Sequence, residues 1–308
     1  MAEYTMIELE NLVEKKTKLT GVDLANANLR CANLSNAYLE GANLTGADLS
    51  NANLSDAYLE EVNLTGADLS NANLSKTYLS EANLTGADLS NANLSEACLF
   101  DANLSKVDFT NANLWKANFG EINLENANFN LANLREVKLW GANLCEANLY
   151  CANLCEGDLA ETNLTGANLT GATLCGANLR EANLSGADLT KANLSGAILT
   201  RANLRGAILY EGNLNFANMH LAKLNGANLK DAKLNGANLR SADFDGANLI
   251  GAGLYDANLI LANLADANLW GAGLKGANLM EAWYTKSTKW PPGFDPKIVG
   301  ALLLGDYS

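Results

Sequence analysis

The chain has 308 residues, of which 48% are apolar but only 7% aromatic, and it carries a formal net charge of -13. Strong negative charge disfavours binding to nucleic acid phosphates and to anionic lipid surfaces. Polar residues recur every few positions, so no stretch approaches the roughly 18 apolar residues of a membrane span. We therefore expect neither direct nucleic-acid binding nor membrane association.

The N-terminal segment, residues 1–16, predicts a short helical cap. Thr5 and Glu8 have the spacing of a capping box, and apolar residues beginning at Leu9 then fall on one helical face. We expect a helix over residues 5–16 that covers the start of the following segment. The segment has neither the basic region nor the apolar stretch of a signal peptide, so a cytoplasmic location is expected.

A five-residue period governs residues 17–282. From Leu19 to Leu279 every fifth residue is apolar, without a slip of register, and a small or β-branched residue stands two positions earlier. Five matches neither the 3.6-residue period of a helix nor the two-residue period of a long strand. The residues after each Leu are often turn formers, such as Thr-Gly. Each unit therefore predicts a short extended piece that buries Ala and Leu, followed by a corner.

A second period, of twenty residues, predicts how many units close one turn. The segment Asn43–Ser55 recurs unchanged at Asn63–Ser75 and Asn83–Ser95. Twenty residues are four units, so a four-sided coil is the geometric interpretation, and recent duplication of a 20-residue block is the alternative. Stacked in this way, the repeats would form about thirteen coils.

The repeat pattern ends after Leu279. Two tryptophans, a phenylalanine and all three prolines of the chain follow, and residues 283–308 are predicted to form a C-terminal cap. Repeat coils need caps because a terminal coil has no neighbour on its outer side. Such an end could also join two copies of the chain, so a homodimer through a cap is one expectation.

The repeated Ala-(Asp/Asn)-Leu-X-X unit resembles that of the pentapeptide repeat family. The resemblance covers about residues 17–282, with Leu at the central inward position and Ala two residues before it. It implies an all-β fold, a right-handed quadrilateral parallel β-helix with an N-terminal helical cap and a C-terminal cap. The segment Trp290–Pro296 is similar to the tail of cyanobacterial members.

Residues twenty apart would align in columns on the outside of the coil. Amide columns, such as the one from Asn33 to Asn153, predict hydrogen-bonded ladders of side chains. Acidic columns are harder to explain as structure, because like charges on adjacent strands are destabilising. One acidic column is a candidate partner-binding site, with a merely solubilising surface as the alternative. Its members are Glu61, Glu81, Asp101, Glu121, Glu161 and Glu181, and a second acidic column, the Asp column, consists of Asp48, Asp68, Asp88 and Asp108.

Large apolar residues also fall at positions predicted to face outward. Contiguous exposed apolar patches mark interaction sites, whereas scattered ones do not. Four such residues close together in the chain are therefore further partner-binding candidates, with incidental exposure as the alternative. They are Phe100, Trp115, Trp140 and Tyr150.

No catalytic, metal-binding or cofactor-binding pattern is apparent, and we expect no enzyme, no metal and no cofactor. His220 is the only histidine, and the six cysteines contain no CxxC pair, which disfavours a Ser-His-Asp triad and a zinc site. A filled coil is also expected to leave no cleft. Cys155 and Cys175 share a column at disulfide-compatible spacing, but in a reducing cytoplasm we expect two free thiols.

These expectations favour a noncatalytic scaffold or regulatory module that binds an unidentified protein through the faces of its coil. The alternative is a DNA mimic that binds a type II topoisomerase such as gyrase, as a resemblance to quinolone-resistance members of the family implies. Concentrated charge favours this alternative, since residues 1–179 carry 9 Lys/Arg and 23 Asp/Glu, whereas residues 180–308 carry 12 and 11. The Leu-rich interior disfavours it, because those members prefer Phe at the central position.

Overall fold

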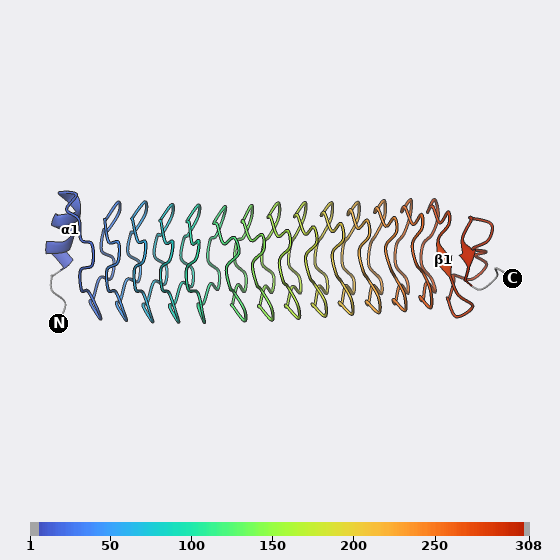
Figure 1. The fold of residues 1–308 in the computed structure, drawn as a ribbon, viewed down its shortest axis with the longest axis horizontal. Helices are drawn as coiled ribbons and strands as arrows, with labels where there is room; N and C mark the ends of the chain where they lie inside the picture. Colours follow the sequence, from blue (N-terminus) through green and yellow to red (C-terminus); the bar gives the residue numbers. More distant parts are fainter. Residues whose placement is uncertain (1–5, 305–308) are drawn as a thin grey trace. The chain divides into compact units, whose positions relative to one another are not determined.

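The computed structural model describes residues 6–304. The chain divides into two compact units, unit 1 (Met1–Asn153) and unit 2 (Leu154–Ser308). Figure 1 shows each unit as a succession of coils. Within the described residues the regular elements are α1 (Met6–Glu14), β1 (Trp283–Tyr284) and β2 (Leu302–Leu303).

Between these elements, the backbone forms single parallel bridges that join residues twenty apart. Asn43 pairs with Asn63 in unit 1, and Asn183 pairs with Asn203 in unit 2. Four five-residue repeats therefore complete one turn in each unit. The geometric interpretation of the twenty-residue period is confirmed within each unit.

Each corner of the coil is a β-turn that the repeat sequence favours. Ala47 N donates to Leu44 O at 3.1 Å, and Gly46 has a φ of 63°. This is the pattern of a type II turn, whose third residue adopts the left-handed region that glycine favours. Asn43 supports the turn, because its Oδ1 accepts hydrogen bonds from the backbone N and the hydroxyl of Thr45 at 3.2 and 2.7 Å.

The interior of both units is filled by the Ala and Leu side chains of the repeats, as the spacing of two predicts. Leu44 in unit 1 and Leu184 in unit 2 are fully buried. Burying one Leu side chain is worth about 1.5–3 kcal/mol, so these columns dominate stability. In unit 1 three inward positions hold Phe instead. Phe119 meets Phe109 and Phe129 edge-on at 5.9 and 6.3 Å, and those two rings stack at 4.9 Å.

The outward columns have structural roles that differ in kind. In the column from Asn33 to Asn153, each Nδ2 donates to the Oδ1 one coil earlier at 2.8 to 3.4 Å, which confirms the predicted amide ladder. Each member of the Asp column accepts the backbone N–H two residues later, at 2.9 to 3.0 Å. The Ser50 hydroxyl also holds the pKa of Asp48 below its usual value. The Asp column therefore stabilises corners, as asparagine does elsewhere.

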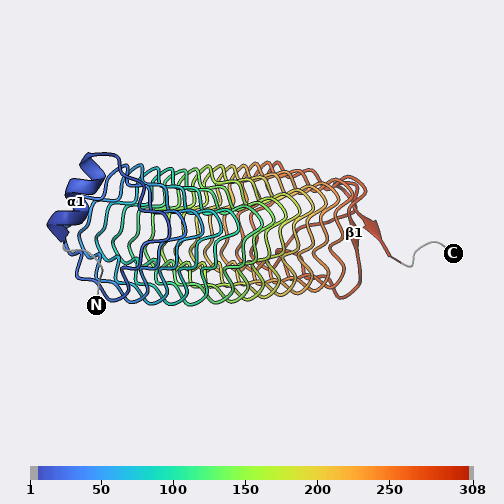
Figure 2. The ribbon, with the colours of Figure 1, turned by 60° about the vertical axis from the view of Figure 1, so that its left-hand side comes forward.

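Helix α1 lies across the start of the first coils of unit 1 (Figures 1 and 2). Leu9 is fully buried, and Glu10 Oε1 accepts a hydrogen bond from Asn33 N at 2.8 Å. These two contacts attach the helix to the coil. The predicted helix start at Thr5 lies outside the described residues.

At the end of unit 2, β1 pairs in parallel with β2. Tyr284, Trp290 and Phe294 form an aromatic cluster, with ring centroids 5.6 and 5.2 Å apart along the series. Trp283 also bridges to Asn263 in the coil before it. The segment after the repeats thus continues the coil for part of a turn, and residues 305–308 of the predicted cap lie outside the described residues.

Cys155 and Cys175 form a disulfide in unit 2, with Cα atoms 4.7 Å apart. The prediction of two free thiols was therefore wrong. Both cysteines occupy the same corner position in consecutive coils, so the repeat itself brings them to bonding distance. Only the assumed reducing compartment argued against the bond.

Candidate functional site

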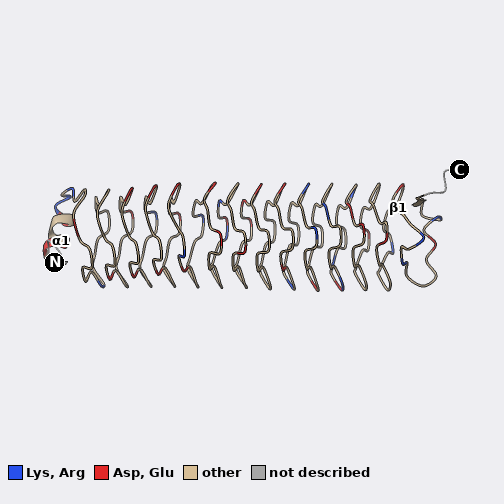
Figure 3. Ribbon diagram, turned by 60° about the horizontal axis from the view of Figure 1, so that its bottom comes forward, with Lys and Arg blue, Asp and Glu red and all other residues tan. Residues whose placement is uncertain are grey.

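The acidic candidates of unit 1 lie at successive corners along one edge of the coil. We name the corners 60–61, 80–81, 100–101, 120–121 and 140–141 the acidic edge. Four carboxylates stand at the left-handed position of these turns, with φ between 55 and 58°. Figure 3 shows acidic positions recurring at the bends of successive coils. The four residues are Glu61, Glu81, Asp101 and Glu121.

Backbone hydrogen bonds hold these corners in register. Glu61 N donates to Ser80 O and Glu81 N to Phe100 O, each at 3.0 Å. Within residues 6–304, none of the four carboxylates forms an ion pair or a side-chain hydrogen bond. The acidic edge therefore presents four unpaired charges spaced by one coil.

Two of the apolar candidates, Phe100 and Trp140, lie on the same edge. Each is 40% exposed. Gly120 stands between them, and a Cβ added there would lie 2.7 to 2.9 Å from three atoms of the Trp140 indole. The indole thus rests against Gly120 and occupies the space that a side chain would need. The acidic edge consequently combines two exposed aromatic rings with its carboxylates.

The other two apolar candidates lie on different corners. Trp115 is half-buried, its indole N–H donates to Glu136 Oε1 at 3.3 Å, and Lys116 Nζ lies 4.4 Å from its ring centroid. The indole hydrogen bond, together with Lys116, holds the pKa of Glu136 below its usual value. Tyr150 is 46% exposed. The four apolar candidates therefore do not form one patch.

The two acidic candidates of unit 2 have a different environment. Glu181 accepts from Arg180 and Arg201, each at 3.3 Å. Hydrogen bonds from Arg201, and then from Arg180, hold the pKa of Glu181 below its usual value. Glu161 lies one coil earlier and forms no ion pair within the described part of the chain. One of these two carboxylates is thus already neutralised by its neighbours.

Tyr38, Tyr58 and Tyr78 stand twenty residues apart and form a column of aromatic side chains in unit 1. Their rings stack at 4.8 and 5.1 Å, with planes within 9° of parallel. The Tyr38 side chain, followed by burial, raises the pKa of Tyr58. The same offset of twenty could have predicted this stack, because it places equal side chains at strand spacing.

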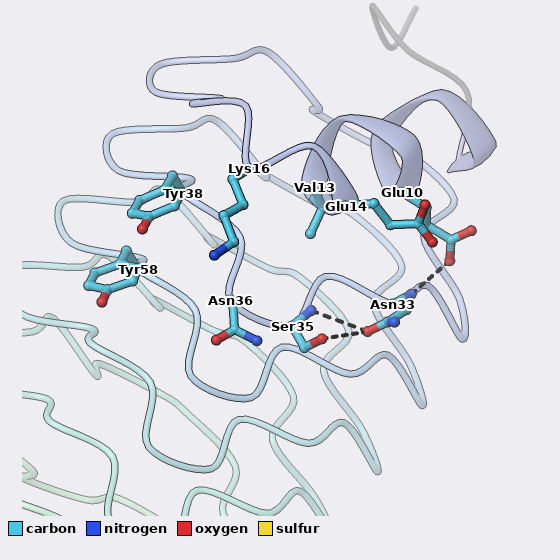
Figure 4. Close-up of a pocket in the computed structure, with 9 residues that line it drawn as sticks. All are labelled: Glu10, Val13, Glu14, Lys16, Asn33, Ser35, Asn36, Tyr38 and Tyr58. Carbon is cyan, nitrogen blue, oxygen red and sulfur yellow. Dashed lines mark hydrogen bonds between the residues drawn. The ribbon is translucent and has the colours of Figure 1, made fainter.

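A cavity of about 480 Å³ lies between α1 and the first coils of unit 1. Figure 4 shows Glu10, Glu14 and Lys16 among its lining residues. The expectation of no cleft concerned the filled coil. This cavity lies beside the coil, where the chain leaves the helix and enters the first coils.

Within residues 6–304, no group of three or more His, Cys, Asp or Glu side chains could hold a metal ion. No helix in the same range combines the length and the apolarity needed to cross a bilayer. The acidic edge offers charge and aromatic contact surface.

Comparison with solved structures finds pentapeptide repeat proteins from cyanobacteria. HetL from Nostoc sp. strain PCC 7120, described as involved in heterocyst differentiation regulation, is 38% identical over 71% of this chain and 87% of its own, with a TM-score of 0.33. The Nostoc protein alr5209 is 39% identical over 33% of this chain and 84% of its own (TM-score 0.33). Rfr23 from Cyanothece 51142 is 41% identical over 30% of this chain and 63% of its own (TM-score 0.30). Among curated proteins, none matches significantly.

The family described as pentapeptide repeats matches in eight copies. The matched residues are 17–56, 67–105, 102–141, 127–166, 158–196, 187–226, 222–259 and 257–282. Together these copies cover most of the chain and support a right-handed β-helix. The chain therefore belongs to the pentapeptide repeat family.

Proposed function

We propose that the protein is a noncatalytic scaffold that binds another protein through the acidic edge of unit 1. The observation that carries this proposal is the presence of two exposed aromatic rings and four unpaired carboxylates on one edge. Aromatic residues supply much of the binding energy at protein interfaces, and charge complementarity selects the partner. Pentapeptide repeat proteins are in general noncatalytic scaffolds, which supports the scaffold role but does not bear on the acidic edge.

The spacing of the carboxylates at the acidic edge adds a second argument. They occupy left-handed corner positions that other non-glycine residues also occupy along the coil, so the backbone alone does not distinguish them. Like charges at strand spacing repel one another. Four acidic residues there lower the stability of the free protein, and a basic partner would relieve the repulsion.

Affinity capture with charge-reversed variants tests the proposal. The variant Glu81→Lys/Asp101→Lys/Glu121→Lys should lose a partner that the unmodified protein captures from the source cell. The matched control changes three exposed acids of unit 1 on other corners, Asp56→Lys, Glu96→Lys and Glu146→Lys.

The control should keep the partner, because its net charge equals that of the test variant. Replacing both Phe100 and Trp140 by Ser should also abolish capture. Equal capture by the test and control variants, or the absence of any specific protein with the unmodified chain, would refute the role of the acidic edge.

A second candidate is a DNA mimic that binds a type II topoisomerase. The charge of unit 1 favours it, with 9 Lys/Arg against 20 Asp/Glu. Each member of the Asp column accepts an internal hydrogen bond and still contributes its negative charge. Gyrase supercoiling, measured with and without a quinolone at micromolar concentrations of this protein, decides the matter: unchanged supercoiling and inhibition exclude the candidate.

A further inference from the structure

The cavity beside α1 has the size of a small-molecule site, and most of the side chains that line it are polar or charged. Its volume of about 480 Å³ falls within the range of about 300–1,000 Å³ that such sites have. Figure 4 shows the carboxylates of Glu10 and Glu14 at one end and Lys16, with the hydroxyls of Tyr38 and Tyr58, toward the other. The cavity therefore separates negative from positive charge along its length.

The end of α1 fixes the position of Lys16 in this cavity. Lys16 N donates to Val13 O at 2.8 Å, Thr17 N donates to Leu12 O at 2.9 Å, and Lys16 has a φ of 54°. These two bonds and the left-handed residue form a Schellman motif, which terminates a helix. The Lys16 side chain thus starts from a defined backbone position at the rim of the cavity.

The opposite charges in the cavity do not neutralise each other. Glu14 and Lys16 form no ion pair, with each other or with another group, in the part of the chain that the structure describes. Glu14 is the last residue of α1, and the last turn holds no basic residue. The carbonyl end of a helix disfavours negative charge. A cation bound beside Glu14 would relieve this repulsion, and an anion would find an unpaired ammonium group at Lys16.

The tyrosines add hydrogen-bond donors at the Lys16 end. Tyr38 and Tyr58 stack at 4.8 Å, so both hydroxyls are held on the same side of the coil. Tyr38 first, and then burial, raise the pKa of Tyr58, and its hydroxyl is protonated at neutral pH, as that of tyrosine ordinarily is. A protonated phenol donates to a carboxylate.

We propose that this cavity binds a basic amino acid of the arginine or lysine type. The side-chain cation would lie at Glu10 and Glu14, and the α-carboxylate at Lys16 and the tyrosine hydroxyls. Val13 lies between the two ends in Figure 4, where the methylene groups of the ligand would pack. No residue of the acidic edge lines this cavity, and the proposal does not depend on the scaffold function.

Calorimetric titration of the full chain with L-arginine and with agmatine, which lacks the carboxylate, tests both ends of the site. The unmodified protein should bind arginine more tightly than agmatine. Lys16→Met should lower the affinity for arginine by about tenfold, the usual effect of one charge-assisted hydrogen bond. The affinity for agmatine should fall by less than about twofold. Glu14→Gln should lower the affinity for both ligands by about tenfold.

The matched controls are Lys76→Met and Glu96→Gln, which remove the same charges from exposed corners of unit 1 away from the cavity. Both controls should bind as the unmodified protein does, and Lys16→Arg should keep the preference for arginine. Circular dichroism verifies that α1 is retained in each variant. The proposal fails if the unmodified protein shows no binding at about 10 mM arginine. It fails equally if the unmodified protein binds arginine no more tightly than agmatine, a comparison that needs no variant.

Discussion

Glu121 of unit 1 and Glu181 of unit 2 stand at equivalent corners of the coil but differ in whether their charge is paired. The acidic edge of unit 1 leaves its carboxylates unpaired, whereas Arg180 and Arg201 bind Glu181 in unit 2. The backbone is the same, with φ of 58° at both Glu121 and Glu181. Unit 1 has 9 Lys/Arg against 20 Asp/Glu, and unit 2 has 12 against 14. The repeat therefore determines the backbone of a corner and leaves its side chains free to differ, so recognition resides in the side chains.

The largest expected difference between the units lies in their cores. Phe119→Ala in unit 1 and Phe244→Ala in unit 2 each remove a fully buried ring, and each should cost about 3–5 kcal/mol. Phe119 also loses two edge-on aromatic contacts, which should add about 0.5–1.5 kcal/mol. Urea unfolding, with hydrogen exchange resolved by unit, measures both costs. A larger loss for Phe244→Ala would contradict the contribution assigned to the ring cluster.

Reducing the Cys155–Cys175 disulfide should destabilise unit 2 selectively. The bond closes a loop of 20 residues, and a cross-link of that length is worth about 2–4 kcal/mol. Hydrogen exchange in unit 2 should accelerate after addition of a dithiol reductant, while that of unit 1 stays unchanged. In the variant Cys155→Ser/Cys175→Ser the reductant should have no further effect. Peptide mapping that finds both thiols free before reduction would show that the bond is absent.

Gly120→Ala should disturb the aromatic part of the acidic edge. The added Cβ would meet the Trp140 indole at 2.7 to 2.9 Å, and overpacking of this kind costs about 1–3 kcal/mol. The indole should move toward solvent, with a red shift of the Trp140 fluorescence isolated by subtracting a Trp140→Phe variant. Thr200→Ala, at the equivalent corner position of unit 2, is the control and should leave stability within about 0.5 kcal/mol. An unchanged Trp140 spectrum would mean that the ring does not rest on Gly120.

The smallest expected effect concerns the acid stability of unit 2. Because its arginine partners lower the folded-state pKa of Glu181, this carboxylate stabilises the fold above its unfolded pKa of about 4.3, and that stabilisation is lost as pH falls through the folded value. Glu181→Gln should therefore flatten the loss of thermal stability of unit 2 between about pH 5 and pH 3. Arg205→Gln, whose side chain bonds to Asn225 instead, should leave that pH dependence unchanged. An unchanged profile for Glu181→Gln would show that the arginine pairs do not stabilise the folded state.

Most of the coil could be predicted from the sequence. The spacing of two between Ala and Leu specifies which side chains are buried, and the spacing of twenty specifies which side chains align between successive coils. The Asn113–Asn133 hydrogen bond follows directly from that offset. The acidic edge was predicted only in part. Phe100 and Trp140 differ by a multiple of twenty and share an edge, whereas Trp115 was grouped with them because it is near in the chain. Position around the coil, and not distance along it, decides which residues meet.

Other features do not follow from the repeat. The cavity depends on the direction in which α1 leaves the coil, which the turn at Lys16 determines. The disulfide does follow from the repeat geometry, with Cα atoms of Cys155 and Cys175 at 4.7 Å. The prediction of free thiols was wrong because it gave an assumed reducing cytoplasm more weight than the short Cα–Cα distance that the twenty-residue period implies.

The twenty-residue register also limits how such a chain can change in length. Insertion of a single five-residue repeat between Asn93 and Asp101 would keep every Leu inside, yet it would rotate all later corners by a quarter turn. Asp101 and Glu121 would then leave the edge that holds Glu81, and the bond between Asn93 and Asn113 would be broken. Insertion of four repeats at the same place would lengthen the edge and keep the carboxylates and the amide column in register. Length variation that keeps a straight binding surface in unit 1 is therefore restricted to whole coils, although the core alone would tolerate steps of five residues.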